Sequence, residues 1–394
     1  MSTAKLYWEL PFALTFEAEA ATWTMYGDRR AVVLPSTLFY PEGGGQLGDT
    51  GVLKMGAREV RIVDTQIDEA GTIFHLVDGE PAEGDGAVTG IVDQARRLDH
   101  MAQHTAQHML SCALVDVAKA PTVSARLGLA SCTLDVDRGS LTDAQLLGAE
   151  DLVNDVIRSD VAVRAFFPTP EELGKLDLRR APKVDSGVRI VEIEGFDLTP
   201  CGGTHCTRTG QIGVLRIAGT ERYKGKTRVS FHAAKRALVD ARAKEHALLE
   251  LAKMFSCGAL DVGQAAERLR ADLKDRTDAL GRARGELTTH VADGLLAAHA
   301  PDASGTTVLF LEREDDLGTL RTLAGRLTAR PDVVAICVSP DAATGAWLVV
   351  AQRGATASFD CGAWLKAKAE AHGGRGGGRP ERAEGRLPKG TTVP

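Results

Sequence analysis

Two short segments of the chain place metal-binding residue types at the same spacing. "HTAQH" puts His104 and His108 four residues apart, and much later "CGGTH" puts Cys201 and His205 four residues apart. On a helix, residues at this spacing lie on one face, so both histidines of the first pair can point at a single ion. The two glycines of the second segment disfavour a helix and predict a tight loop. Three histidines and one cysteine are ligands that zinc prefers. The sequence therefore predicts one zinc site built from two distant pairs.

Two other interpretations of these residues stay open at this point. The histidines and the cysteine can be ordinary buried side chains, or the zinc can be purely structural, because four protein ligands close a site that catalysis needs open. Two classes of zinc enzyme are excluded by the neighbouring residues. Thr105 follows the first histidine where zincin-type peptidases need glutamate, and no "HxE…PCxxC" arrangement typical of nucleobase deaminases is present.

Length and composition indicate an ordinary globular protein of several domains. The chain has 394 residues, 44% of them hydrophobic and 25% charged. The start, "MSTAKLYWELPF", lacks the features of a secretory signal, and no apolar run is long enough to span a membrane, so a cytoplasmic location is expected. The seven scattered cysteines do not suggest a disulfide framework. The net charge of −6 argues against a uniformly basic surface, although the tail from Lys366 onward is basic.

The first half of the chain changes from strand-like to mixed patterns. Residues 1–92 are rich in short apolar or alternating runs separated by turn residues, and they contain the glycine-rich segment "FYPEGGGQLGDTG". Asp93 is a suitable N-cap for a helix that carries the first histidine pair. Residues 93–232 mix strands and helices, and the strand "GVRIVEIEGFDLTP" leads into the cysteine loop.

The second half is predicted to contain a helical arm and a small α/β unit. Residues 233–300 favour two helices, interrupted by "SCGALD", that form a hairpin. Leucines recur along the second helix, which leaves plain packing and a coiled-coil dimer contact as alternatives: Leu269, Leu273, Leu280 and Leu287. Residues 301–394 follow a β-α-β-β-α pattern. They end in "HGGRGGGRPERAEGRLPKG", which we interpret as a floppy tail or as a loop that binds a ligand or RNA.

Four of these segments, in this order, resemble one protein family. "FYPEGGGQLGDTG", "HTAQH" and "CGGTH" resemble motifs of the editing half of alanyl-tRNA synthetase and of the related AlaX proteins, and "GGRGGGRPERAEG" resembles the signature of their DHH-associated domain. The resemblance implies an α+β multidomain fold. Because the chain begins almost directly at the editing-type region, we expect the long AlaX type without an aminoacylation domain. The implied domains are a β-barrel (1–92), a zinc-dependent α/β editing domain (93–232), a helical hairpin arm (233–300) and a small α/β domain of the DHH-associated type (301–394).

The resemblance also implies an activity and a set of site residues. The expected enzyme is an aminoacyl-tRNA deacylase that hydrolyses the ester between serine, or glycine, and tRNA(Ala). Such editing is needed because an alanine pocket cannot strongly reject an isostere that adds a hydroxyl group. His104, His108, Cys201 and His205 would bind one zinc ion per chain, and Gln46 and Thr133 would lie in the substrate pocket. Cys206 follows His205 where the family more often has an aliphatic residue, so it is a candidate competing ligand, and the choice of Cys201 as the thiolate is what the resemblance implies.

Two basic segments are candidates for contact with tRNA, and no DNA or membrane partner is expected. They comprise Arg222, Lys224, Lys226 and Arg228 just after the cysteine loop, and Arg375 and Arg379 in the tail. A homodimer through the arm and the C-terminal domain is compatible with the pattern. Two alternative functions remain: a zinc-stabilised tRNA-binding protein without catalysis, and a deacylase for another aminoacyl-tRNA.

Overall fold

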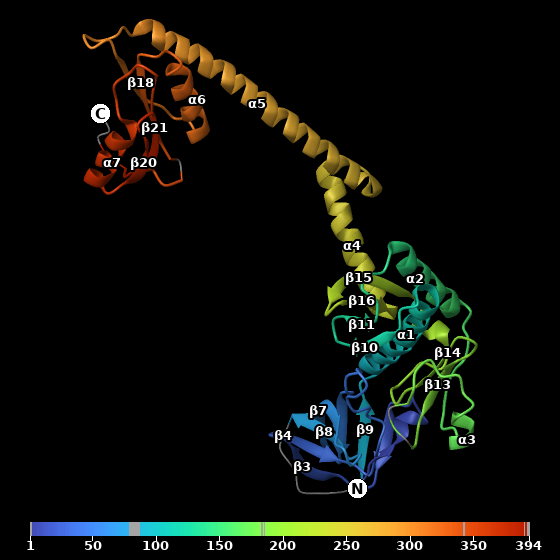
Figure 1. Cartoon of the computed structure of the whole chain (residues 1–394). Coiled ribbons are helices and arrows are strands. Elements are labelled where there is room, and N and C mark those ends of the chain that lie inside the picture. Colours follow the sequence, from blue (N-terminus) through green and yellow to red (C-terminus); the bar gives the residue numbers. More distant parts are fainter. Residues whose placement is uncertain are drawn as a thin grey trace. The chain divides into compact units, whose positions relative to one another are not determined.

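The structure is a computed structural model that describes residues 2–78, 87–182, 184, 186–341, 343–389 and 391. The chain divides into two compact units, Met1–Leu249 and Glu250–Pro394, and each is considered by itself (Figure 1). Within the described residues, none of the helices combines the length and the apolar character that a membrane span requires.

The first unit begins with a seven-stranded sheet in which all neighbouring strands are antiparallel. Its strand order is β2-β9-β6-β7-β8-β4-β3, and a small parallel pair, β1 (Ala4–Lys5) with β5 (Ser36–Thr37), lies apart from it. Apolar residues of alternating strand positions form its core together with Leu38 and Phe39. The strands are β2 (Thr15–Ala18), β3 (Thr22–Tyr26), β4 (Arg29–Val33), β6 (Gly51–Met55), β7 (Arg58–Ile67), β8 (Ile73–Asp78) and β9 (Val88–Val92).

The prediction of a closed N-terminal β-barrel is wrong. In the described residues β2 and β3 are the two edges of the sheet, and no ladder joins them. The reason lies in the number of strands: seven strands with only antiparallel neighbours leave the two edges running in the same direction. Parallel pairing of consecutive strands needs a crossover of about a dozen residues, whereas only residues 19–21 separate β2 from β3. This connectivity cannot close the sheet.

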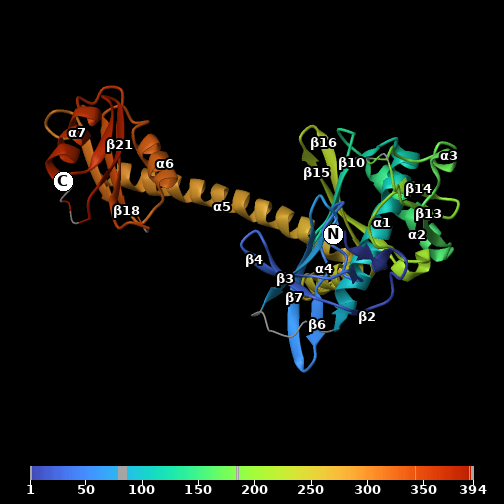
Figure 2. The same ribbon diagram turned by 90° about the horizontal axis from the view of Figure 1, so that it is seen from below.

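The next part of the unit surrounds one buried helix, α1 (Gln94–Ala118). Asp93 caps it as predicted, since its side chain accepts a hydrogen bond from the Arg96 amide, and residues 100–114 are buried. One antiparallel sheet and helix α2 (Asp143–Arg158) pack against α1 around a shared core (Figure 2). The strands of this sheet, in order, are β10 (Thr122–Leu127), β11 (Cys132–Val136), β16 (Lys226–Ala233) and β15 (Leu215–Tyr223).

A three-stranded antiparallel sheet completes the first unit and leads into the cysteine loop. Its strands are β12 (Val163–Phe166), β13 (Ile190–Ile193) and β14 (Asp197–Pro200), and the short helix α3 (Pro170–Leu173) follows β12. The predicted strand before Cys201 is therefore present, as two antiparallel strands joined by a turn. The backbone amide of Cys201 donates to the Arg189 carbonyl at 2.9 Å, which fixes the start of the loop against β13.

Two helices occupy the region predicted to be the arm. They are α4 (Ala234–Phe255) and α5 (Val262–Ala298), separated by residues 256–261, which contain a short 3-10 helix, η3 (Ala259–Asp261). The interruption lies at the predicted segment, while a packed hairpin remains a prediction. Four leucines of α5 are exposed in this chain: Leu269, Leu273, Leu280 and Leu287.

The second unit contains a five-stranded sheet covered on both faces. Alternate residues of β18 point to opposite sides, where Val334 and Ile336 meet α7 and Ala335 and Cys337 meet α6. The sheet order is β17-β18-β19-β21-β20, and only the pair β17 with β18 is parallel. The elements are β17 (Thr307–Glu312), α6 (Leu317–Leu327), β18 (Val333–Pro340), β19 (Trp347–Arg353), α7 (Cys361–His372), β20 (Arg375–Arg379) and β21 (Arg382–Leu387).

The basic C-terminal segment is neither a floppy tail nor an open loop but a β-hairpin. β20 pairs with β21, and β21 pairs with β19, so the segment completes the sheet. Its glycines permit close approach: a Cβ at Gly378 would lie 2.5 Å from the Cα of Ala383 and would also collide with the Arg382 carbonyl. On the helix that packs against the hairpin, a Cβ at Gly362 of α7 would lie 2.8 Å from the Gly378 carbonyl oxygen. Gly378 and Gly362 therefore serve packing inside this unit.

Candidate metal centre

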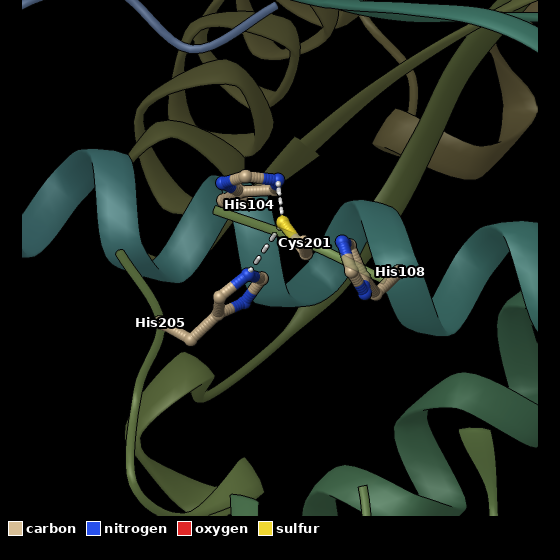
Figure 3. A group of neighbouring side chains, drawn as sticks. All are labelled: His104, His108, Cys201 and His205. Atoms are coloured by element: carbon tan, nitrogen blue, oxygen red, sulfur yellow. Dashed lines mark hydrogen bonds between the residues drawn. The ribbon is translucent and has the colours of Figure 1, made fainter. Parts of the chain in front are cut away.

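Helix α1 and the loop after β14 bring the two predicted pairs together (Figure 3). His104 and His108 project from one face of the helix toward Cys201 and His205. The Cys201 Sγ atom lies 3.4 Å from His104 Nε2 and 3.3 Å from His205 Nε2. One ligand atom from each of the four residues lies within 4.8 Å of all the others, and the cluster is nearly excluded from solvent.

These distances and donor types fit a tetrahedral metal ion. With metal–nitrogen bonds of about 2.1 Å and metal–sulfur bonds of about 2.3 Å, tetrahedral ligand atoms are about 3.6 Å apart. The separations around Cys201 are close to this value. The three histidines are buried and Cys201 is partly buried, so an ion here would satisfy polar atoms that solvent hardly reaches. The cluster can therefore hold a metal.

Each of the three histidines has a hydrogen-bonding or charged partner at its second ring nitrogen. His104 Nδ1 lies 2.7 Å from Gln46 Oε1, and His205 Nδ1 lies 3.2 Å from Thr105 Oγ1. The Thr105 hydroxyl donates to the Met101 carbonyl, so it must accept from His205. Partners of this kind fix the tautomer and leave Nε2 of these two rings free to bind a metal.

His108 is supported by a buried carboxylate. Its Nδ1 lies 3.6 Å from Asp197 Oδ2, and Asp197 also binds Arg179, with Nε to Oδ1 at 2.7 Å. Although burial would raise the pKa of Asp197, the nearby His108 ring and the Arg179 guanidinium lower it to about 2. Asp197 is therefore ionised and orients the His108 ring.

The electrostatics of the cluster favour a thiolate at Cys201 and neutral rings at His104 and His205. Burial alone raises the pKa of Cys201, but His104, His108 and His205 outweigh burial and hold that pKa well below its usual range. Burial lowers the pKa of His205 to about 3 and also lowers the pKa of His104, whereas at His108 the negative charges of Cys201 and Asp197 outweigh burial and raise the pKa. Thiolate and neutral imidazole are the forms that bind metal ions.

The "CGGTH" loop has little room for other residues. A Cβ at Gly203 would collide with the His104 ring and would lie 3.0 Å from Gln46 Oε1. Arg189 donates from one Nη1 to the carbonyls of Cys201 and Gly203, at 2.9 and 3.0 Å. A single guanidinium group therefore holds the loop at two of its carbonyls, those of Cys201 and Gly203.

Cys206, the predicted competitor, lies outside the cluster. It packs in the apolar core around α1, and burial raises the pKa of its thiol to about 11. Its backbone amide donates to Thr105 Oγ1 at 3.0 Å. Because the Cys206 thiol is neutral and lies in the core, Cys201 is the cysteine that can supply a thiolate to the cluster.

The glycine-rich segment reaches the cluster through Gln46 and is anchored by an ion pair. Gln46 is fully buried, and its side chain bonds His104 and both the amide and the hydroxyl group of Thr204. Three residues later, Asp49 pairs with Arg97 of α1, and neither side chain is exposed. Arg97 also donates to the carbonyls of Pro11 and Leu38. This contact fixes the segment against the helix that carries His104.

The second predicted pocket residue, Thr133, lies on β11, whose neighbour β10 bridges to Gln46 at Leu127. Its neighbours Cys132 and Leu134 point into the core around α1, so Thr133 belongs to the other face of the sheet, opposite Ser230 of β16. Within the described residues, no hydrogen bond joins Thr133 to the four cluster residues. Its role in a substrate pocket remains a prediction.

The predicted tRNA-binding cations differ in how far they are neutralised. Arg228 pairs with Asp135 at 2.7 Å and stacks on Tyr223, and Lys226 pairs with Asp137. Arg222 and Lys224 are exposed, and in the described part of the chain no carboxylate pairs with them. Arg375 and Arg379 lie on the exposed edge strand β20, again without a described carboxylate partner. The exposed, unpaired cations are the ones suited to phosphates.

Sequence reasoning did not single out Thr105, Thr204 or Asp197 as parts of the centre. A signal for Asp197 was present: Asp197, Thr199 and Cys201 alternate along one strand and therefore share one face. Thr105 stands inside the first motif, but its bond to His205 depends on a contact across a hundred residues.

Comparisons with known proteins agree with this arrangement. Residues 188–230 match the threonyl and alanyl tRNA synthetase second additional domain, residues 9–96 match the class II (A) tRNA synthetases, and residues 305–393 match the DHHA1 domain. The fold and the site thus define a multidomain protein assembled from domains of the class II tRNA synthetase kind.

The similar proteins narrow this class. The alanine–tRNA ligase of Halorubrum lacusprofundi is 31% identical over 330 residues, 82% of this chain and 35% of the ligase. That of Anaeromyxobacter dehalogenans is 32% identical over 370 residues, 91% of this chain and 40% of the ligase. The chain thus spans well under half the length of these relatives. The resemblance predicted from the motifs is confirmed: this is an AlaX-like protein, similar to the editing and C-terminal domains of alanyl-tRNA synthetases.

Proposed function

We propose that the protein is a zinc-dependent deacylase that hydrolyses the ester between serine, or glycine, and tRNA(Ala). It would act in the cytoplasm on tRNA charged by a separate synthetase and would not make aminoacyl-tRNA itself. The observation that carries the proposal is the buried cluster of His104, His108, Cys201 and His205, with a partner at Nδ1 of each histidine. The similarity of the chain to alanine–tRNA ligases favours alanine tRNA over other tRNAs as the substrate.

The chain's own residues prepare the site for ester hydrolysis. A bound zinc ion would supply Lewis-acid polarisation of the ester carbonyl or of a water molecule. Gln46, Thr105 and Asp197 hold the three imidazole rings in one tautomer each, and Arg189 holds the loop that carries Cys201. Removing one such partner in metal enzymes weakens metal affinity or activity by about 10- to 100-fold.

Discrimination between serine and alanine follows from hydrogen bonding. A site that bonds the seryl hydroxyl rejects alanine by roughly 10⁴-fold, because alanine leaves buried polar groups without partners. The synthetase's own pocket can separate the two amino acids only by their size and shape. A second site of this chemistry therefore corrects the error that the first cannot prevent.

The test compares release of serine and of alanine from tRNA(Ala) by the full chain. We expect fast release of serine, little release of alanine, and no pyrophosphate exchange with ATP and alanine. Failure to release either amino acid from zinc-loaded protein would contradict the proposal and favour a tRNA-binding role. Equal release of both would contradict its specificity.

A further inference from the structure

An aromatic and cationic surface lies directly beside the cysteine loop. Trp8, at the end of the short 3-10 helix η1 (Leu6–Trp8), donates from its indole Nε1 to the Gly202 carbonyl at 2.8 Å. Phe167, just after β12, packs against Trp8 with ring centroids 5.4 Å apart and ring planes inclined by 58°. Gly202 is the immediate neighbour of Cys201, so these rings stand next to the metal centre.

Two cations adjoin the same rings. The Lys5 ammonium lies 4.4 Å from the centroid of the Trp8 ring. The Arg189 guanidinium lies 6.0 Å from the same centroid, but it is buried and bonded to the cysteine loop. Within the described residues, neither cation is paired with a carboxylate. We call Trp8, Phe167, Lys5 and Arg189 the aromatic platform.

Packing alone does not account for this composition. Phe167 is 53% exposed, although aromatic side chains stabilise a fold by being buried. Lys5 rests on an aromatic face in place of a carboxylate partner. An exposed ring beside the unneutralised Lys5 ammonium is complementary to a flat nucleobase attached to a phosphate.

We propose that the aromatic platform binds the terminal nucleobase at the 3′ end of the tRNA. The base stacks on the exposed face of Phe167 beside Trp8, and Lys5 contacts the adjoining phosphate. This inference rests on the proposed function. The ester to be hydrolysed is on the ribose of the terminal nucleotide, so when that ester is at the metal centre the base of the same nucleotide must lie close beside it. The platform is bonded to the loop of that centre through Gly202.

Stacking is tested with the dinucleotide CpA and the full-length protein. We expect Phe167→Ala to weaken CpA binding about tenfold, within the range seen when an aromatic stacking partner is truncated. It should raise KM for Ser-tRNA(Ala) similarly with little change in kcat, and leave hydrolysis of serine methyl ester unchanged. The matched control is Leu147→Ala on α2, since Leu147 is 58% exposed and belongs to no part of the platform.

The outcomes separate this inference from the proposed function. Equal CpA binding by wild type, Phe167→Ala and Leu147→Ala would overturn the platform, even if serine release were intact. Weakened CpA binding by Phe167→Ala alone supports the platform, even if the wild type released no serine and the deacylase proposal failed. Lys5→Gln supplies a second test, because loss of one phosphate contact should reduce the salt dependence of CpA binding.

Discussion

At the scale of single residues, the metal centre depends on hydrogen bonds as much as on ligands. The four ligands were predictable because residue type and spacing alone restrict where two histidines on a helix can point. Their partners were not predictable in the same way. The bond between Gln46 and His104, for example, needs the glycine-rich segment to fold onto α1, and only the Asp49–Arg97 contact shows how it does so.

Gln46 gives the sharpest prediction at this scale. Gln46→Ala removes the acceptor that fixes the His104 ring and should weaken zinc affinity about 10- to 100-fold. Gln46→Glu retains an acceptor and should keep most of that affinity. Competition with a chromophoric chelator measures both variants, and wild-type affinity in Gln46→Ala would show that Gln46 does not support the metal site.

At the scale of elements, hydrophobic period and turn residues predicted which segments are helices and strands, but not how the strands close. Asp93, α1 and the strand before Cys201 follow directly from local pattern. The closed barrel failed because closure depends on the direction of two edge strands. The glycine-rich tail was misjudged because glycine allows strands to approach α7 closely as readily as it allows disorder.

The N-terminal sheet should lose stability in mild acid through His75. This fully buried ring lies between Val32 O and Thr37 Oγ1, both at 2.8 Å, and burial lowers its pKa to about 4. Between pH 6.5 and 4 the unfolded chain takes up a proton that the folded chain does not, so stability falls as pH falls, by about 3 kcal/mol in all.

Hydrogen exchange of the β4 and β8 amides, compared at pH 7 and pH 5, measures this effect locally. His75→Leu should be less stable at pH 7, because Thr37 loses its partner, but its pH dependence should be flatter. If both proteins showed the same change with pH, another group would be responsible.

The C-terminal hairpin offers a matched pair of glycines. Gly378→Ala places a methyl group against the backbone of β21 and should destabilise the second unit by about 1–3 kcal/mol. Gly377→Ala meets no atom within 4 Å and should have little effect. Urea unfolding of both variants, followed by the fluorescence of Trp347 and Trp364, distinguishes them. Equal midpoints would mean that the hairpin accommodates the methyl group at Gly378 without a loss of stability.

At the scale of the whole molecule, the acidic net charge conceals local basic surface. Arg222 and Lys224 are exposed near the turn between β15 and β16, whereas Lys226 and Arg228 are held by Asp137 and Asp135. The sequence placed all four in one segment, but only the structure separates paired from unpaired cations. A homodimer through the exposed leucines of α5 stays a prediction.

Binding of tRNA should therefore depend on Arg222 and Lys224. The variant Arg222→Gln with Lys224→Gln should lower affinity and reduce the slope of log K against log salt by about 2. Arg158→Gln is the control, because Arg158 is exposed but already paired with Asp155. An unchanged slope in the double variant would place the tRNA elsewhere.

The central claim is that a metal held by Cys201 and three histidines performs the hydrolysis, and two neighbouring cysteines allow one direct measurement. Zinc content and serine release from Ser-tRNA(Ala) are measured in the same preparations of wild type, Cys201→Ala and Cys206→Ala. We predict that Cys201→Ala loses both, whereas Cys206→Ala, altered only in the core, retains both. Full zinc content and full serine release in Cys201→Ala would contradict the account.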